Sequence, residues 1–354
     1  MANIAVIDVA ADGGGALSVL SDFIHTLKES KTKHQWYIFT SVVEIEETPT
    51  IHNLVFPEVK KSWLYRLYWE NMMLPGLLRK KKIAAVLSLQ NGGVPVGSWT
   101  QFIYFHNIIL LQKRNTFSFI KKEERRHAIY LNLIGTYVRW TLSRAQKIFV
   151  QANHVKDKMC VLGINQVSVI RPNVPETTNI RQKGKIRGYI YPTPAKKYKN
   201  IEYIFEAERI LNSRGEKIDV LLTIDQDDSG YAKKLYNEAK DLNGITFIGR
   251  QERNKLIAMY EDYGLVITSR FESFPIPIAE AINCGTVIVA LNYPYAKELL
   301  ERYNRAYIAE RPFLAEALEK GMKDQKEAIY YQKEYLSYQD MIQEIEGCVM
   351  NGEG

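Results

Sequence analysis

Residues 265–290 read LVITSRFESFPIPIAEAINCGTVIVA, and this stretch decides the fold. It opens with an apolar run and closes with a second run rich in Val and Ile, which predicts two strands, at 265–268 and 286–290. Between them, Pro277 opens a segment that we expect to be helical, because proline suits the first turn of a helix. Strands that alternate with helices build parallel sheets, so the fold class is α/β.

The same alternation extends over all 354 residues. It predicts two doubly wound domains, 1–175 and 176–325, joined by a polar linker at 171–185. The last segment, 326–354, is expected to form a helix that packs back on the first domain. Ligands of such domains bind at the carboxyl ends of the strands, so we expect the site in a cleft between the domains. The other predicted strands are 4–9, 35–40, 84–89, 101–105, 147–150, 167–170, 186–191, 217–223 and 246–248. The other predicted helices are 16–28, 63–80, 121–143, 153–162, 201–213, 229–242, 252–261, 313–322 and 325–346.

Composition and charge indicate a globular protein and leave several partners open. Hydrophobic residues make up 46% and charged residues 25%, which excludes a disordered chain. The three cysteines show no disulfide or metal spacing and fit a reducing cytoplasm, and no 18-residue apolar window predicts a membrane span. Residues 1–172 contain 22 Lys and Arg against 12 Asp and Glu. The first half is therefore basic and suited to polyphosphates, anionic lipids or nucleic acid.

The loop and helix start within 270–280 form the first candidate site. Backbone N–H groups near Ser273, Phe274 and Ile276 lie at a helix start and can hold a phosphate. Glu280 lies about one turn inside the helix, where its carboxylate can accept hydrogen bonds from vicinal hydroxyls such as a ribose diol. This combination favours a nucleotide site.

Two glutamates separated by seven residues, Glu272 and Glu280 in ESFPIPIAE, carry a family resemblance. With the upstream stretch FIGRQERNKLIAMYEDYGLVITS, this segment resembles the retaining glycosyltransferases of family 4. The resemblance spans most of the second half and implies the GT-B fold, in which two Rossmann-like domains face a central cleft. It also implies transfer of a sugar from a nucleotide diphosphate sugar with retention and without a metal or other cofactor. The sequence departs from the family at Pro275, where relatives usually carry Gly, and the proline removes one N–H from the loop.

The resemblance assigns further residues to the donor. Glu272 would face the reacting sugar, and Lys199 of YIYPTPAKKYKN matches the lysine that neutralises the diphosphate in the family. Six residues before that lysine the family commonly has Arg, whereas this chain has Thr193, so Lys197 or its neighbour Lys196 is a candidate substitute.

In the first domain the resemblance points to the glycines Gly14 and Gly15 of ADGGGALS, which let the backbone approach a ligand. It also places His106 of YFHNIILLQ near the sugar, as a third catalytic candidate beside Glu272 and Lys199. Asn91 and Asn107 are weaker candidates for the acceptor side. The three aspartates of IDQDDSG are interpreted as a strand-to-helix turn, and no metal site is expected.

The expected partners are a nucleotide sugar and a lipid-linked or saccharide acceptor, with a role in surface polysaccharide or glycolipid assembly. Aromatic residues alternate with basic clusters in WLYRLYWENMMLPGLLRKKK and FSFIKKEERRHAIY, which favours peripheral contact of a cytoplasmic enzyme with an anionic membrane. Nucleic acid is not expected, because no nucleic-acid-binding module is recognisable. Two alternatives remain: a nucleotide-sugar epimerase of the same fold, and a catalytically silent partner subunit.

Overall fold

The computed structural model describes residues 1–174, 181–182, 184–331 and 335–351. The chain divides into two units. The first contains Met1–Thr116, His127–Asn173 and Glu334–Gly354, and the second contains Phe117–Arg126 and Val174–Lys333. The boundary predicted at 175/176 lies outside the described residues, as does part of the predicted linker.

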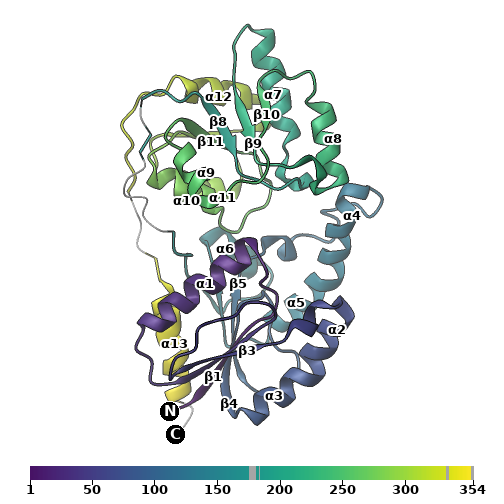
Figure 1. Ribbon diagram of the computed structural model, residues 1–354, viewed down its shortest axis with the longest axis vertical. Helices are drawn as coiled ribbons and strands as arrows, with labels where there is room; N and C mark the ends of the chain where they lie inside the picture. The colour runs from purple at the N-terminus through teal and green to yellow at the C-terminus, as the bar shows by residue number, and fades with distance from the viewer. Residues whose placement is uncertain (175–180, 183, 332–334, 352–354) are drawn as a thin grey trace. The chain divides into compact units, whose positions relative to one another are not determined.

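The first unit is built on a seven-stranded parallel sheet in the order β3-β2-β1-β4-β5-β6-β7 (Figure 1). The strand numbers fall toward β1 and rise after it, so the strand order reverses between β1 and β4. Doubly wound sheets bind ligands at this switch point, in the crevice outside the carboxyl ends of these two strands. Its strands are β1 (Asn3–Asp8), β2 (Gln35–Thr40), β3 (Ile51–Val55), β4 (Ile83–Ser88), β5 (Thr100–Phe105), β6 (Lys147–Val150) and β7 (Val167–Val169). Its helices are α1 (Gly14–Glu29), α2 (Trp63–Tyr68), α3 (Leu74–Lys80), α5 (Gly135–Leu142), α6 (Asn153–Val161) and α13 (Tyr338–Asn351), with α4 (Lys122–Ile129) at the division between the units.

Helices cover both faces of this sheet. One face packs its alternate strand residues against α1 and α13, with Phe23, Tyr104 and Tyr338 in one cluster (Figure 1). The opposite face packs against the segment that contains α2 and α3, where Trp69 is fully buried. The two amphipathic layers bury the strands from both sides, as a parallel sheet requires.

The second unit repeats the plan with a six-stranded parallel sheet in the order β10-β9-β8-β11-β12-β13. Its switch point lies between β8 and β11. The strands are β8 (Gly188–Tyr191), β9 (Val220–Leu222), β10 (Ile245–Phe247), β11 (Tyr263–Ile267), β12 (Ile288–Leu291) and β13 (Ala306–Ala309). The helices are α7 (Glu202–Ser213), α8 (Gly230–Glu238), α9 (Arg253–Met259), α10 (Ile276–Asn283), α11 (Pro294–Leu300) and α12 (Leu314–Met322).

The stretch that opened the sequence analysis folds as β11, a loop, α10 and β12, as predicted. Helix α10 ends at Asn283, and Gly285, just beyond the C-cap residue Cys284, has a φ of 67°, in the left-handed region. The N–H of Gly285 donates to Ile282 O, and the next N–H donates to Ala281 O. This closing motif needs a residue without a Cβ, which explains the glycine between helix and strand.

One predicted helix was wrong in its start, and two others form over the expected residues with a local irregularity. The helix expected over 325–346 begins at Tyr338, because Ser337 and Asp340 cap it reciprocally: Ser337 N donates to Asp340 Oδ2 at 2.7 Å, and Asp340 N approaches Ser337 Oγ at 3.4 Å. Residues 332–334 of that prediction lie outside the described residues. The long helices expected at 63–80 and 121–143 are each interrupted by a π-helical turn, at Trp69–Met73 and Tyr130–Ile134. The edge strands β3 and β13 and the short helix α11 were not predicted.

Candidate functional site

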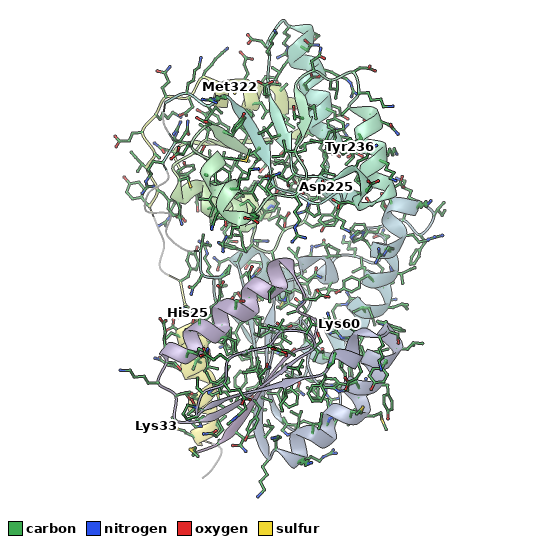
Figure 2. The ribbon with its side chains drawn as sticks, viewed as in Figure 1. His25, Lys33, Lys60, Asp225, Tyr236 and Met322 are labelled. Carbon is green, nitrogen blue, oxygen red and sulfur yellow. The ribbon has the colours of Figure 1, made fainter. Side chains whose placement is uncertain are left out.

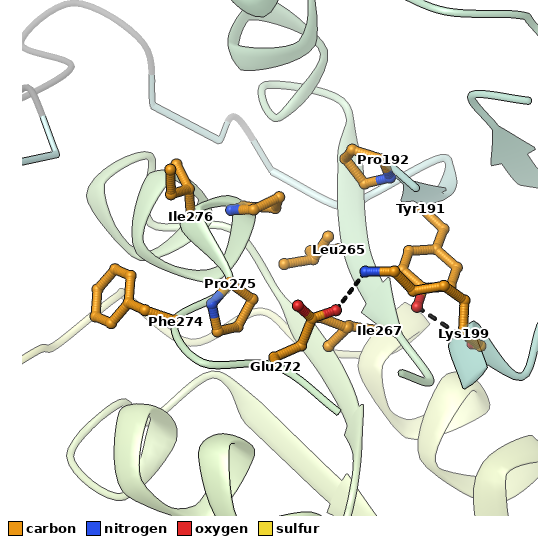
Figure 3. Close-up of a pocket in the computed structure, with 10 residues that line it drawn as sticks. Tyr191, Pro192, Lys199, Leu265, Ile267, Glu272, Phe274, Pro275 and Ile276 are labelled. Carbon is orange, nitrogen blue, oxygen red and sulfur yellow. Dashed lines mark hydrogen bonds and ion pairs between the residues drawn. The ribbon is translucent and has the colours of Figure 1, made fainter. Parts of the chain in front are cut away.

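A pocket of about 190 Å³ lies at the switch point of the second unit (Figure 3). Its walls come from the ends of β8, the side of β11, and the loop that leads into α10. Apolar side chains form most of the lining, and two charged ones, Lys199 and Glu272, meet inside it. The lining residues are Tyr191, Pro192, Lys199, Leu265, Ile267, Glu272, Phe274, Pro275, Ile276 and Pro277.

Lys199 and Glu272 form an ion pair, with 2.5 Å between Nζ and Oε1. Their side chains are only 12% and 17% exposed. Burial by itself would lower the pKa of Lys199. The charge of Glu272, the neighbouring Tyr191 and Tyr198, and the hydrogen bond to Glu272 together outweigh burial and hold that pKa above its usual value. Lys199 is therefore a fixed cation in the wall of the pocket.

The turn that carries Lys199 is tied to the end of β11. Asn200 has the left-handed φ of 53°, and its Nδ2 donates to Thr268 O at 3.0 Å. Thr268 Oγ1 donates in turn to Lys199 O at 2.7 Å. Tyr191 Oη donates to the same carbonyl at 3.3 Å, and burial raises the pKa of Tyr191 to about 12, so the hydroxyl keeps its proton. These hydrogen bonds fix the backbone of Lys199 relative to the carboxyl ends of β8 and β11.

The start of α10 supplies backbone donors to the same pocket. Pro275 is the N-cap residue and Pro277 lies in the first turn, and neither has an N–H. The N–H of Ile276 between them is therefore the first that the helix itself offers. No side chain caps this end, and Phe274, Pro275 and Ile276 line the pocket (Figure 3). Ser273 is buried behind them, 6% exposed.

Glu280 lies in the fifth position of α10 and is 5% exposed. Its Oε1 accepts a hydrogen bond from Nε of Arg253, the first residue of α9, at 2.6 Å. Arg253 was not identified from the sequence, because it sits 27 residues upstream in a segment whose charges look solvent-exposed. The pair connects the starts of two helices that follow β10 and β11.

Two other residues considered at this site have different surroundings. Lys197 pairs with Glu202, and its Nζ lies 5.6 Å from the centre of the Tyr231 ring. It does not line the pocket with Lys199. Thr193 is 4% exposed, and its backbone N–H donates to Thr223 Oγ1 at 2.9 Å. Neither side chain, as placed, supplies a second cation to the pocket.

In the first unit, the glycines lie between β1 and α1. Helix α1 begins at Gly14, has no side-chain cap and has no acidic residue in its first turn. A Cβ placed on Gly13, Gly14 or Gly15 would meet no atom within 4 Å. Nearby, Lys60 donates to Ala10 O at 2.9 Å and to Asp12 Oδ2 at 2.7 Å (Figure 2). The backbone of this turn is therefore open to a ligand.

His106, Asn91 and Asn107 follow β5 and β4. Asn91 Oδ1 accepts from the N–H of His106 at 2.7 Å, and His106 Nε2 lies 2.9 Å from Leu89 O. We assign the proton to Nε2, since a carbonyl only accepts, which leaves Nδ1 as an acceptor in the neutral ring. Burial lowers the pKa of His106 and favours that neutral form. Asn107 caps the next turn through Oδ1 and Ile109 N.

Further polar residues near the switch point of the first unit were not identified from the sequence. Glu70, 8% exposed, accepts from Arg66 Nε at 2.9 Å and from Gln90 Nε2 at 2.8 Å. Asp8 ends β1 and is 1% exposed, and its Oδ1 has no hydrogen-bond partner among the described residues. Burial raises the pKa of Asp8 to about 7, against the opposing effects of Ala11 N–H, Arg66 and Lys60. In the sequence, Glu70 and Asp8 could have been noticed only as charged residues within an otherwise apolar helix or strand.

Neither a cluster of metal-binding side chains nor a membrane-spanning helix is present in the part of the chain that the structure describes. No group of three or more His, Cys, Asp or Glu in that part of the chain is arranged to hold a metal ion. In the same residues, no helix combines the length and the apolar character needed to cross a bilayer.

Residues 176–335 match the family model described as glycosyl transferases group 1. None of the curated proteins matches the sequence. The structure is similar to sucrose-phosphate synthase from Thermosynechococcus elongatus, with a TM-score of 0.68, 15% identity, and 100% of this chain and 98% of that chain covered. It is also similar to HepE of Anabaena, solved with UDP and glucose, with a TM-score of 0.63, 16% identity and coverage of 92% and 90%.

A third similar structure is WaaG, a glycosyltransferase involved in lipopolysaccharide biosynthesis, with a TM-score of 0.63, 13% identity and coverage of 91% and 90%. At these identities the structural likeness shows the fold. The chain therefore has the GT-B fold, with two Rossmann-like domains, and the match to the group 1 glycosyltransferase model lies in its second half. The predicted fold class and the predicted GT-B fold are confirmed.

Proposed function

We propose that this chain moves a sugar from a nucleoside diphosphate sugar to a hydroxyl group of an acceptor, with retention at the anomeric carbon. The observation that carries the proposal is the buried pair of Lys199 and Glu272, 2.5 Å apart in the wall of the switch-point pocket. Sugar transfer needs a cation for the leaving diphosphate and a negative charge beside the sugar, which becomes positive as the bond breaks. These two side chains supply both.

In the reaction, the bond between the anomeric carbon and the diphosphate oxygen breaks, and negative charge accumulates on the diphosphate. Lys199 and the N–H of Ile276 stabilise that charge, so no metal is needed for it. Glu272 stabilises the oxocarbenium-like sugar. The acceptor hydroxyl oxygen attacks from the face that the diphosphate leaves, and its proton passes to the departing diphosphate oxygen. Glu280 accepts hydrogen bonds from the ribose hydroxyls.

The acceptor is assigned to polar residues of the first unit. His106 Nδ1 can accept a hydrogen bond from a sugar hydroxyl, and Asn91 and Asn107 lie on the same two strand ends. We propose a lipid-linked or saccharide acceptor in surface polysaccharide or glycolipid assembly. Support comes from WaaG, which is involved in lipopolysaccharide biosynthesis, and from HepE, which was solved with UDP and glucose.

Contact with an anionic membrane is part of this proposal. Two exposed apolar stripes have helical spacing: one is Leu64, Tyr68 and Met72, and the other is Ile129, Leu133 and Trp140. Their exposed fractions run from 45% to 69%. Basic side chains border them, since the guanidinium of Arg144 lies 4.9 Å from the centre of the Trp140 ring. Apolar stripes with basic borders suit the interface of an anionic bilayer.

The experiment is a thermal-shift screen of nucleoside diphosphate sugars, followed by product analysis with the donor that stabilises the fold most. A true donor raises the melting temperature by mass action, and this rise should be lost in Lys199→Ala and Glu280→Ala. Hydrolysis of the nucleotide sugar to free sugar would argue against a catalytically silent subunit. Conversion of the donor to an epimer without any acceptor would instead identify a nucleotide-sugar epimerase. Absence of any stabilising nucleotide sugar would contradict the proposal.

A further inference from the structure

Arg253 occupies a position that the reaction chemistry leaves unexplained. Its Nε donates to Glu280 Oε1 at 2.6 Å, and the Glu280 side chain is 6% exposed while that of Arg253 is 46% exposed. A buried carboxylate is costly unless it is paired. Arg253 is the hydrogen-bond partner of that carboxylate among the described residues, so it fixes the orientation of the Glu280 side chain.

The surroundings of Glu280 are otherwise apolar or poor in donors. Its neighbours on α10, Ala281 and Ile282, belong to the buried core. Tyr260 is fully buried, burial and the charge of Glu280 raise its pKa, and its Oη has no partner in the described residues. Oε1 of the carboxylate thus accepts from Arg253, whereas no hydrogen bond to Oε2 occurs among the described residues.

Arg253 also has donors to spare. A guanidinium carries five N–H groups, and the ion pair with Glu280 uses the one on Nε. The two Nη atoms donate to no described residue. Because the side chain is nearly half exposed and its Nε is bonded to Glu280, these donors are accessible to a ligand that binds beside the carboxylate.

From this arrangement we infer that Arg253 belongs to the nucleoside subsite of the donor. It positions Glu280 through Nε and donates from Nη to an oxygen of the nucleoside, not to the diphosphate, which Lys199 and Ile276 N–H hold. The inference rests on the proposed function, since it assumes that a nucleoside diphosphate binds in this unit. Arg253 would thus recognise the nucleoside part of the donor and not its diphosphate charge.

The test compares binding of a nucleoside diphosphate with binding of inorganic pyrophosphate by isothermal titration calorimetry. UDP, GDP and ADP are first ranked on the wild-type protein, and the tightest is used for the variants. We expect Arg253→Ala to weaken the nucleoside diphosphate at least about tenfold, because a hydrogen bond to a charged group is lost, and to leave pyrophosphate within about twofold. Arg253→Lys should recover part of the loss, since it keeps the charge without the fork of donors.

Two further comparisons separate positioning from general damage. Arg250→Ala is the matched control, because Arg250 is an exposed arginine three residues away whose backbone N–H, not its side chain, contacts Asp225. The wild-type protein should bind the 2′,3′-dideoxy analogue more weakly than the ribose form, and Arg253→Ala should reduce that difference. Equal losses for pyrophosphate and nucleotide, or unchanged nucleotide affinity, would overturn the inference. If the wild type binds none of the three nucleotides, the proposed function itself fails.

Discussion

The Nζ atom of Lys199 lies 2.5 Å from Oε1 of Glu272, although the two residues are 73 positions apart in the chain. The pair is largely buried, and it joins the turn after β8 to the loop before α10. A diphosphate entering the pocket would compete with Glu272 for the same cation. The ion pair is therefore expected to stabilise the folded chain before the donor binds and to rearrange when it binds.

Replacing Lys199 by Met should lower the free energy of unfolding by about 3 kcal/mol or more, because it leaves the Glu272 carboxylate buried without its cation. Urea unfolding followed by circular dichroism measures this loss. The control is Lys197→Met, which breaks a more exposed pair with Glu202 and should cost less than about 1 kcal/mol. Similar losses in both variants would contradict a special role for the Lys199 pair.

Removing both charges should separate stability from binding. In Lys199→Met/Glu272→Gln no buried charge is left alone, so the double variant should be more stable than Lys199→Met by about 1–3 kcal/mol. It should still bind nucleoside diphosphate at least about tenfold more weakly than wild type, because the phosphate cation is missing. Calorimetric titration with the best nucleotide gives the second quantity. A double variant that binds like wild type would remove Lys199 from the donor site.

The sequence predicted the parts of the fold that depend on local pattern. The two doubly wound domains, the helix start near Pro277 and the position of Glu280 about one turn inside α10 all follow from apolar runs, proline and spacing. The strands β3 and β13 were not predicted because both lie at a sheet edge, where a strand is less buried and needs no continuous apolar run. The sequence of β3, IHNLV, accordingly has polar residues at its centre.

Contacts between distant segments were not predictable in the same way. The partner of Glu280 is Arg253 and that of Lys197 is Glu202, and each choice depends on side-chain packing rather than on spacing. Asp8 and Glu70 gave only a weak signal, a charge inside an apolar run, and their burial becomes evident only when the sheet and helices are assembled. The chemical role of Glu272 still rests on the family resemblance.

Asn200 should control the position of Lys199. Its left-handed backbone, with φ of 53°, costs about 1–2 kcal/mol for a residue such as Ala, whereas Gly adopts it without strain. Both replacements lose the hydrogen bond to Thr268 O. Nucleotide affinity should therefore fall in the order Asn200, Asn200→Gly, Asn200→Ala, as measured by titration. An alanine variant with higher affinity than the glycine variant would be inconsistent with this account.

The two apolar stripes should mediate membrane contact. Leu64→Asp/Met72→Asp places charges on side chains that are 69% and 67% exposed, so the fold should tolerate them while binding to vesicles falls at least about tenfold. Flotation with vesicles of phosphatidylcholine and phosphatidylglycerol at physiological salt measures the bound fraction. The matched control is Val161→Asp, on α6, where an apolar side chain is 86% exposed outside the stripes. Failure of the wild-type protein to float would reject the membrane proposal.

Asp8 should make stability fall as the pH rises from about 4 to about 8. Burial raises its pKa from the ordinary value to about 7 in the folded chain, so between these values the folded state binds more protons than the unfolded state. A shift of about three pKa units corresponds to a penalty of up to about 4 kcal/mol above pH 7 and to none below pH 4. Asp8→Asn removes the titrating group, so its free energy of unfolding relative to wild type should rise across this window.

Asp340 provides the opposite control, because its hydrogen bonds with Ser337 lower its pKa, and Asp340→Asn should lose stability relative to wild type as the pH rises from acid. Urea unfolding at pH 4, 6 and 8 gives the Asp8 slope. Unfolding at about pH 2 and about pH 3 gives the Asp340 slope, because its pKa is lowered from the ordinary value of 3.8. Parallel pH profiles for wild type and Asp8→Asn would show that the Asp8 carboxyl does not titrate in this range.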